Sequence, residues 1–205
     1  MKNIRYIFIL MLTWMLYGTS FAQINNRALS VMDKTVQTFK ADGGVSIQFE
    51  GSQQGELWLK DDKFKLKCNG IVSWFDGETQ WTLMEEAQEV NVVSPTPDEI
   101  QTINPYSMIS SYRQRFECSY KGVSRIDGKE VDIVLLTAKD KTGTIQKISL
   151  MISRMFRPVK MEIVDDNGNV QTIMVKEYKT GKKFRLSDFR FDPNQYPDVE
   201  IIDMR

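Results

Sequence analysis

Histidine, the side chain that most often supplies acid–base catalysis and metal ligands, does not occur among the 205 residues of this sequence. Its absence removes every Ser–His and Cys–His pair that could activate a nucleophile. The two cysteines, Cys68 and Cys118, are too few to build a zinc site by themselves. We therefore expect a protein that is not an enzyme and that has no metal centre and no cofactor.

Paired carboxylates are the remaining candidates for catalysis, because two neighbouring acids can divide the roles of general acid and general base. Two such pairs occur, Glu85-Glu86 and Asp165-Asp166. Both lie at expected hairpin turns, where charged residues are usually exposed. We interpret them as turn residues, and burial of either pair beside another carboxylate would favour an enzyme instead.

The two cysteines lie in apolar runs that alternate with polar residues, Phe64-Leu66-Cys68 and Phe116-Cys118-Tyr120. In an oxidising compartment they could form a disulfide. They could equally be two separate buried thiols, because a sequence does not give the distance between their Cα atoms. Both alternatives stay open.

Large apolar side chains are the other candidates for a site, and their chemistry is the binding of an apolar ligand. Trp58, Trp74 and Trp81 lie close together and could form broad walls. Methionine is flexible and suits adaptable apolar surfaces. Alternatively these residues are ordinary core, since the sequence does not show which face of a strand each side chain takes. The methionines at suitable places in the expected elements are Met108, Met151, Met161 and Met174.

One helix is expected near the start, from Asn25 to Phe39, before Asp42-Gly43-Gly44. Its apolar residues recur at spacings of three and four, so one stripe faces the rest of the protein. This stripe would be the buried face of a helix that covers a sheet. It consists of Leu29, Met32, Val36 and Phe39.

The rest of the chain alternates with period two, which is typical of strands. Turn signals of hairpin length separate the strands and indicate antiparallel pairing. Prolines 95 and 97 interrupt the series and precede two short helices, Asp98–Ile100 and Tyr106–Tyr112. A sheet of so many strands must curl strongly, leaving its concave side for the helices. The expected strands are 45–49, 57–59, 63–68, 71–75, 79–84, 90–92, 115–120, 131–137, 145–153, 159–164 and 170–178, with 199–201 as a terminal edge strand.

The first 22 residues have the layout of a secretory signal peptide, with Lys2 and Arg5 before the apolar run Ile7–Leu16 and small residues at Ser20 and Ala22 before the expected cleavage. An uncleaved anchor is the alternative, but the run of ten apolar residues is short for a membrane span. Residues 23–205 would then form a single domain. Without Lys2 and Arg5 the chain has 25 basic and 27 acidic residues, so nothing in its charge favours nucleic acid.

Several segments together resemble the family of periplasmic outer-membrane lipoprotein carriers, LolA and its relatives. They follow one another in the order that the family has, and they span nearly the whole chain after the signal. The helix ends in Thr38–Ala41, and the family's G-[DE]-L-W-x-K strand and D-G-x-T-x-W hairpin correspond to Gly55–Lys60 and Asp76–Trp81. Glu89-Val90 follows at the spacing of the family's E-Q-V, and the N-P pair and the F-x-F-x-P ending correspond to Asn104-Pro105 and Phe189–Pro193.

The resemblance implies a mainly β fold with an α lid. It would be an incomplete antiparallel β-barrel of about eleven strands, covered by the N-terminal helix and a short mid-chain helical insert. It implies a monomeric periplasmic carrier that binds the acyl chains of lipid-modified proteins. An inner-membrane ABC-type release complex would supply these proteins, and an outer-membrane acceptor would receive them. The lid underside would be the stripe given above, and the cavity would be lined by Trp58, Phe64, Trp74, Trp81, Met108, Ile109, Phe116, Met151, Met161 and Met174.

Three points stay open beside this resemblance. Well-known members carry a basic residue after the W-x-K motif that holds the lid closed, whereas Asp61-Asp62 stand here. The charged segments 60–63 and 179–185 are expected to be solvated turns, or alternatively a docking patch for the membrane complexes. Finally, the ligand could be another apolar lipid of the envelope, with the protein as its carrier or sensor.

Overall fold

The computed structural model describes residues 26–96, 99–100 and 105–205. The expected signal peptide, Asp98 and Asn104 lie outside these residues. None of the helices within the described residues is both long and apolar enough to cross a membrane.

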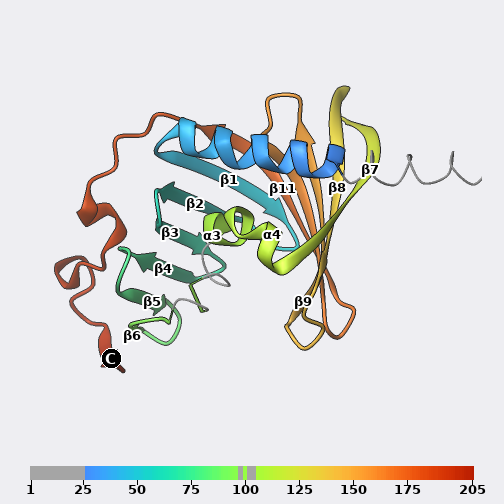
Figure 1. Cartoon of the computed structure of the whole chain (residues 1–205). Helices are drawn as coiled ribbons and strands as arrows, with labels where there is room; N and C mark the ends of the chain where they lie inside the picture. Colours follow the sequence, from blue (N-terminus) through green and yellow to red (C-terminus); the bar gives the residue numbers. More distant parts are fainter. Residues whose placement is uncertain (1–25, 97–98, 101–104) are drawn as a thin grey trace, which may run out of the picture.

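One curved sheet of twelve strands makes up most of the described chain (Figure 1). The strand order is β12-β6-β5-β4-β3-β2-β1-β11-β10-β9-β8-β7, so the early hairpins join the late strands where β1 pairs with β11. All neighbouring pairs are antiparallel except β12 with β6. The strands are β1 Val45–Gly51, β2 Gly55–Lys60, β3 Lys63–Cys68, β4 Ile71–Phe75, β5 Gln80–Met84, β6 Glu89–Val93, β7 Phe116–Ile126, β8 Lys129–Ala138, β9 Ile145–Ser153, β10 Pro158–Asp165, β11 Val170–Lys179 and β12 Glu200–Asp203.

The sheet does not close, because β12 and β7 remain its two edges. This arrangement confirms the expected open, mainly antiparallel barrel, including the terminal edge strand. The clearest difference in length is β7, which continues to Ile126 instead of ending at Tyr120. Gly122 has a φ of 108° and takes up a register shift between β7 and β8, so the strand pairing continues beyond it.

The N-terminal helix, residues 26–42, lies across the concave side of the sheet (Figure 1). Its first half packs with β8 and β9 through Ala28, Val31 and Met32. Its last turns pack with β1, β2 and β3 through Phe39. Two short helices, α3 Pro105–Ser110 and α4 Tyr112–Arg115, lie on the same side and take the place of the expected single helix.

A long C-terminal segment covers the opposite, outer face of the early strands. It contains two short 3₁₀ helices, Leu186–Phe189 and Pro193–Gln195, which the sequence did not indicate. Phe184 stacks on Trp58, and Phe191 and Tyr196 both contact Trp74 edge-on. Both faces of this half of the sheet are therefore covered by apolar side chains.

Two of the motifs from the sequence meet in this outer layer. Asp76, which begins the β4–β5 turn, accepts hydrogen bonds from the N–H groups of Glu78 and Thr79. Its second carboxylate oxygen lies 2.6 Å from Nε of Arg190, the residue between Phe189 and Phe191. The carboxylate is almost fully buried, so the ion pair fixes the C-terminal segment to the turn.

Candidate functional site

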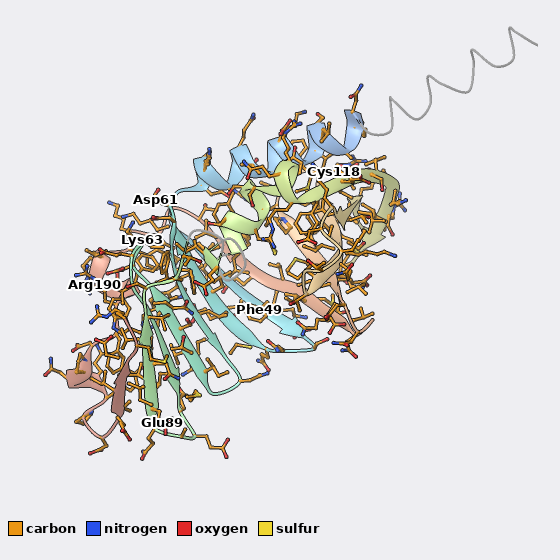
Figure 2. The ribbon with its side chains drawn as sticks, turned by 60° about the horizontal axis from the view of Figure 1, so that its bottom comes forward. Phe49, Asp61, Lys63, Glu89, Cys118 and Arg190 are labelled. Carbon is orange, nitrogen blue, oxygen red and sulfur yellow. The ribbon has the colours of Figure 1, made fainter. Side chains whose placement is uncertain are left out.

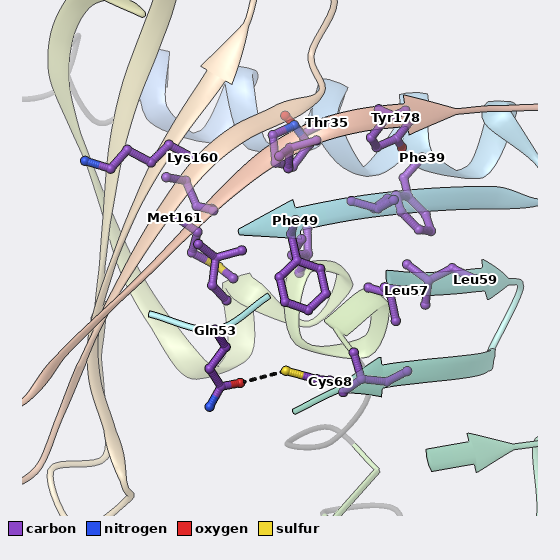
Figure 3. Close-up of a pocket in the computed structure, with 17 residues that line it drawn as sticks. Thr35, Phe39, Phe49, Gln53, Leu57, Leu59, Cys68, Lys160, Met161 and Tyr178 are labelled. Carbon is purple, nitrogen blue, oxygen red and sulfur yellow. Dashed lines mark hydrogen bonds between the residues drawn. The ribbon is translucent and has the colours of Figure 1, made fainter. Parts of the chain in front are cut away.

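A cavity of about 200 Å³ lies between the N-terminal helix and the two halves of the sheet (Figure 3). Its walls come from the helix, from α3, and from strands on either side of the β1–β11 junction. The lining residues are Thr35, Phe39, Ile47, Phe49, Gln53, Leu57, Leu59, Leu66, Cys68, Ile109, Leu150, Pro158, Lys160, Met161, Ile173, Val175 and Tyr178.

Strand alternation explains why so many of these residues are apolar. Successive side chains of a strand point to opposite faces, so residues two apart share one face. Ile47 and Phe49 of β1 lie beside Leu57 of β2 in the cavity wall, and Ile173 and Val175 of β11 continue it. The result is a continuous apolar surface to which strands from both halves of the sheet and two helices contribute.

Few polar atoms reach this surface. The hydroxyl groups of Thr35 and Tyr178 are two of them, and both are hydrogen-bonded. The Thr35 hydroxyl donates to the carbonyl of Val31, one turn earlier in the helix, at 2.9 Å. Burial raises the pKa of Tyr178, and so do the charge of Asp42 and its hydrogen bond with the phenol. Tyr178 therefore stays neutral at physiological pH, and the wall offers no free charge at this place.

Three ion pairs hold the N-terminal helix against its surroundings. Near its start, Arg27 contacts the buried Asp132 of β8 at 3.3 Å. At its end, Asp42 accepts two hydrogen bonds from Arg157, at 2.6 and 2.9 Å. The helix is thus fixed to the sheet at both ends.

The third ion pair joins this helix to α4. Asp33 accepts hydrogen bonds from the Tyr112 hydroxyl at 2.8 Å and from the Arg113 guanidinium. Partial burial opposes ionisation of Asp33, but the bonds from Arg113 and Tyr112 outweigh it and lower the pKa of the carboxyl. Asp61 and Asp62, where the resemblance would place a basic residue, lie in the β2–β3 turn, and Asp62 pairs with Lys63 at 2.7 Å (Figure 2).

Three of the residues expected at the site line the cavity. Ile109 reaches it from α3, Met161 from β10, and Phe39 from the underside of the helix. The others of the helix stripe pack against the core: Met32 is fully buried, and Leu29 and Val36 are partly buried.

Three further candidates are core residues beside the cavity. Phe64 packs against Phe75 in the cluster under the end of the helix. Met108 and Phe116 belong to the cluster beneath its first half. They support the walls and do not themselves line the cavity.

The interpretation of the tryptophans as cavity walls requires a correction. Trp58 lies between Leu57 and Leu59, which line the cavity, and therefore points to the outer face. Trp74 and Trp81 pair across β4 and β5 on this outer face, under Phe191 and Tyr196. They fill the layer beneath the C-terminal segment.

Met151 and Met174 are corrected for the same reason. The neighbours of Met174 in β11, Ile173 and Val175, line the cavity, and so does Leu150 beside Met151. Both methionines consequently lie on the outer side of their strands. Apolar residues occur on both faces of these strands, so the alternation alone could not show which face points into the cavity.

The structure keeps the two cysteines as separate thiols. Cys68 of β3 lines the cavity, and its S–H donates to Oε1 of Gln53 at 3.2 Å. Cys118 of β7 packs against the cluster under the first half of the helix. The disulfide is therefore not formed. Burial raises the pKa of both thiols, that of Cys118 to about 11, so neither is a ready nucleophile.

The carboxylate pairs remain at the surface, as expected. Glu85 and Glu86 are exposed in the β5–β6 turn, and Glu85 contacts Lys67 at 3.6 Å. Asp165 accepts hydrogen bonds from Asn167 and Asn169 within its own turn, and Asp166 is exposed. Neither pair is buried beside another carboxylate.

Several solved structures have a similar fold at low sequence identity. An uncharacterized conserved protein from Thermus thermophilus has a TM-score of 0.62 and 10% identity, covering 86% of this chain and 99% of that one. A putative outer membrane lipoprotein-sorting protein domain from Vibrio parahaemolyticus has a TM-score of 0.48, 11% identity and coverages of 81% and 97%. For the Mycobacterium tuberculosis lipoprotein LppX the values are 0.49, 11%, 79% and 99%. No curated protein matches the chain.

An open barrel that surrounds an apolar cavity beneath a helix defines a class of proteins whose fold is suited to binding apolar ligands. The family within this class follows from the sequence. The family model of the outer membrane lipoprotein carrier protein LolA matches residues 18–167, well over half of the chain. The chain belongs to this family, which confirms the resemblance seen in its motifs.

Proposed function

We propose that this protein binds the acyl chains of lipid-modified proteins in its cavity and carries them from the inner to the outer membrane. The observation that carries the proposal is the cavity itself, whose walls are largely apolar. In this proposal the mature chain, residues 23–205, works in the periplasm as a monomer. A release complex of the inner membrane supplies the cargo, and an outer-membrane acceptor receives it.

The energetics of lipid transfer explain why such a cavity is needed. Burial of one methylene contributes about 0.8 kcal/mol, so three long acyl chains with roughly 48 methylenes represent on the order of 40 kcal/mol as an upper bound. A lipid-modified protein therefore cannot cross the water between the membranes by diffusion without a carrier. A carrier must shield the chains and yet release them, and adaptable side chains such as Met161 suit both tasks.

The volume of the cavity sets a condition on this proposal. About 200 Å³ is available, which lies below the roughly 300–1,000 Å³ of most ligand pockets. A whole acyl chain therefore requires the walls to widen. The empty protein and the loaded protein would be two states, and the lipid would shift the population toward the wider one.

Incubation with spheroplasts tests the proposed transport. The purified protein should release lipoproteins from the membrane into a fraction bound to the carrier. No release above a control without protein would contradict the proposal. Lipid extraction of the carrier-bound fraction, followed by mass spectrometry, would separate lipoproteins from another apolar envelope lipid, which is the second candidate ligand.

A cavity-filling substitution tests the location of the ligand. Ile173→Trp places a large ring in the cavity, whereas Met174→Trp places the same ring on the outer face of the same strand. We expect the first variant to lose about tenfold or more in affinity for a lipopeptide and the second to bind like the original protein. Fluorescence titration measures both, and equal losses would place the ligand elsewhere.

A further inference from the structure

One end of the cavity is distinguished by exposure. Of the seventeen lining residues that the structure describes, Gln53 is the one that is exposed, while the others are buried or half-buried. Gln53 lies in the turn between β1 and β2, and its neighbours Ser52 and Gln54 are exposed as well. The cavity therefore approaches solvent at this turn.

The opposite end, beneath the N-terminal helix, is closed by buried groups. Thr35 and Phe39 cover it and are 2% and 9% exposed. Behind them Tyr178 bonds to Asp42, which Arg157 holds with two hydrogen bonds. Opening this end would break a largely buried ion pair, which is costly.

At the Gln53 end a weak contact joins the β1–β2 turn to β3, whereas on its other side two hydrogen bonds between Ser52 and Thr172 hold the turn to β11. The thiol of Cys68 donates to Oε1 of Gln53, and Figure 3 shows this bond between the β1–β2 turn and β3. A thiol is a weak donor, so little is lost when the bond breaks. The difference between the two ends favours admission of a ligand at the turn, with the helix left in place.

Gln53 also has the chemistry to bind the polar end of a ligand. Its Oε1 is occupied by the thiol, but its Nε2 donates to no group in the described part of the chain. The cationic head of Lys160 points away from the cavity (Figure 3) and pairs with Glu162 at 2.6 Å. A neutral acceptor such as a carbonyl oxygen therefore fits this place better than an anionic group.

We infer that an acyl chain enters the cavity past the β1–β2 turn, and that Gln53 then binds the ester or amide carbonyl at the polar end of the chain. The inference rests on the proposed function, because it assumes that acyl chains occupy the cavity. It assigns the turn as the portal, and Gln53 as the residue that positions the ligand.

The first test obstructs the portal. Gln53→Trp adds a large ring at the opening, and Gln54→Trp adds the same ring one residue further along the exposed turn. Stopped-flow fluorescence with the methyl ester of parinaric acid gives the association rate. We expect it to fall about tenfold in the first variant and to stay unchanged in the second.

The outcomes separate the portal from the function. If the original protein binds no parinaric ester, the proposed function fails. If the original protein binds the ester and Gln53→Trp associates with it as fast as Gln54→Trp does, the proposed function stands and the turn is not the portal.

The second test removes the donor and keeps the length of the side chain. Gln53→Met should weaken binding of the parinaric ester about two- to tenfold, which is the range for one neutral hydrogen bond. Affinity for diphenylhexatriene, which has no carbonyl, should not fall. Equal effects on both probes, or none on either, would overturn the role of Gln53.

Cys68 reports the position of the polar end independently of these variants. In a Cys118→Ser background it is the remaining thiol of the described chain. Saturating parinaric ester should slow its reaction with Ellman's reagent about tenfold, because the bound ester covers the thiol. An unchanged rate with the ester bound would place the polar end elsewhere and contradict the inference.

Discussion

Gly55 lies where two strands of the cavity wall approach each other closely. A Cβ atom there would lie 2.3 Å from the carbonyl oxygen of Lys67 and 2.7 Å from the ring of Phe49. The next residue of the same motif, Glu56, accepts hydrogen bonds from Ser46 and from the indole of Trp58. The G-E-L-W segment is therefore a structural unit in which each residue type has a steric, packing or hydrogen-bonding reason.

Gly55→Ala should destabilise the protein by about 1–3 kcal/mol, the usual cost of forcing extra atoms into a packed site. Gly143→Ala is the matched control, since no atom lies within 4 Å of the added Cβ. Urea unfolding of both variants measures the change. A Gly55→Ala variant as stable as its control would refute the steric argument.

Asp76 joins two motifs that are more than a hundred residues apart. Burial of its carboxyl raises the pKa, but hydrogen bonds from the N–H groups of Thr79 and Glu78 and from Arg190 together outweigh burial, so the net shift is downward. A lowered pKa in the folded state means that the ionised form stabilises the fold. That contribution is complete above the unfolded pKa of about 3.9 and is lost as pH falls through the folded value.

Asp76→Asn should therefore cost about 1–3 kcal/mol of unfolding free energy at pH 7. The difference between the two proteins should begin to shrink below about pH 4, where the carboxyl of the unfolded chain becomes protonated, and should disappear as pH falls through the lower pKa of the folded state. Chemical unfolding across this pH range measures it. Glu86→Gln, in an exposed turn, serves as the control and should show no such dependence.

At the scale of elements, the sequence could predict where most strands and the first helix lie, because their apolar residues recur with the right period. The sequence could not predict which face of the sheet each side chain takes. Leu57, Trp58 and Leu59 are three apolar residues in a row, and only the register with β1 and β3 shows that the tryptophan is outside. The layer that the C-terminal segment adds is a tertiary feature without local periodicity.

The same limit applies to the candidate site. Of the expected cavity and lid residues, Ile109, Met161 and Phe39 line the cavity, whereas the lining residue Gln53 had no signal in the sequence. A polar glutamine in an exposed turn resembles any other until the opposite strand is known. Its contact with Cys68 depends on the pairing of β2 with β3, which brings the end of β3 beside the β1–β2 turn.

The N-terminal helix is expected to loosen from one end when an ion pair is removed. Arg157→Ala leaves the largely buried Asp42 without its guanidinium, so the last turn of the helix should open more often. Hydrogen exchange of the amides of residues 38–42 should accelerate about tenfold, whereas those of residues 30–34 should change little. Arg185→Ala, which removes an exposed pair with Asp188, is the control.

At the scale of the whole molecule, we expect charge to contribute little to ligand binding. The sequence has 27 basic and 27 acidic residues, and Lys160, the charged residue of the cavity wall among those described, is paired with Glu162. Binding of a neutral lipopeptide should therefore change less than about twofold between roughly 0.05 and 0.5 M salt, because there is little Coulomb attraction to screen. Titrations at both concentrations test this, and a steep salt dependence would indicate a charged subsite.

The outer aromatic layer has a consequence for folding during synthesis of the protein. Trp58 and Trp74 belong to strands made early, but the rings that cover them, Phe184, Phe191 and Tyr196, are made more than a hundred residues later. Until then these indoles face water on a half-built sheet, which invites aggregation. A nascent chain therefore needs shielding until the C-terminal segment is made, and a late blue shift of tryptophan emission should mark the packing of this segment.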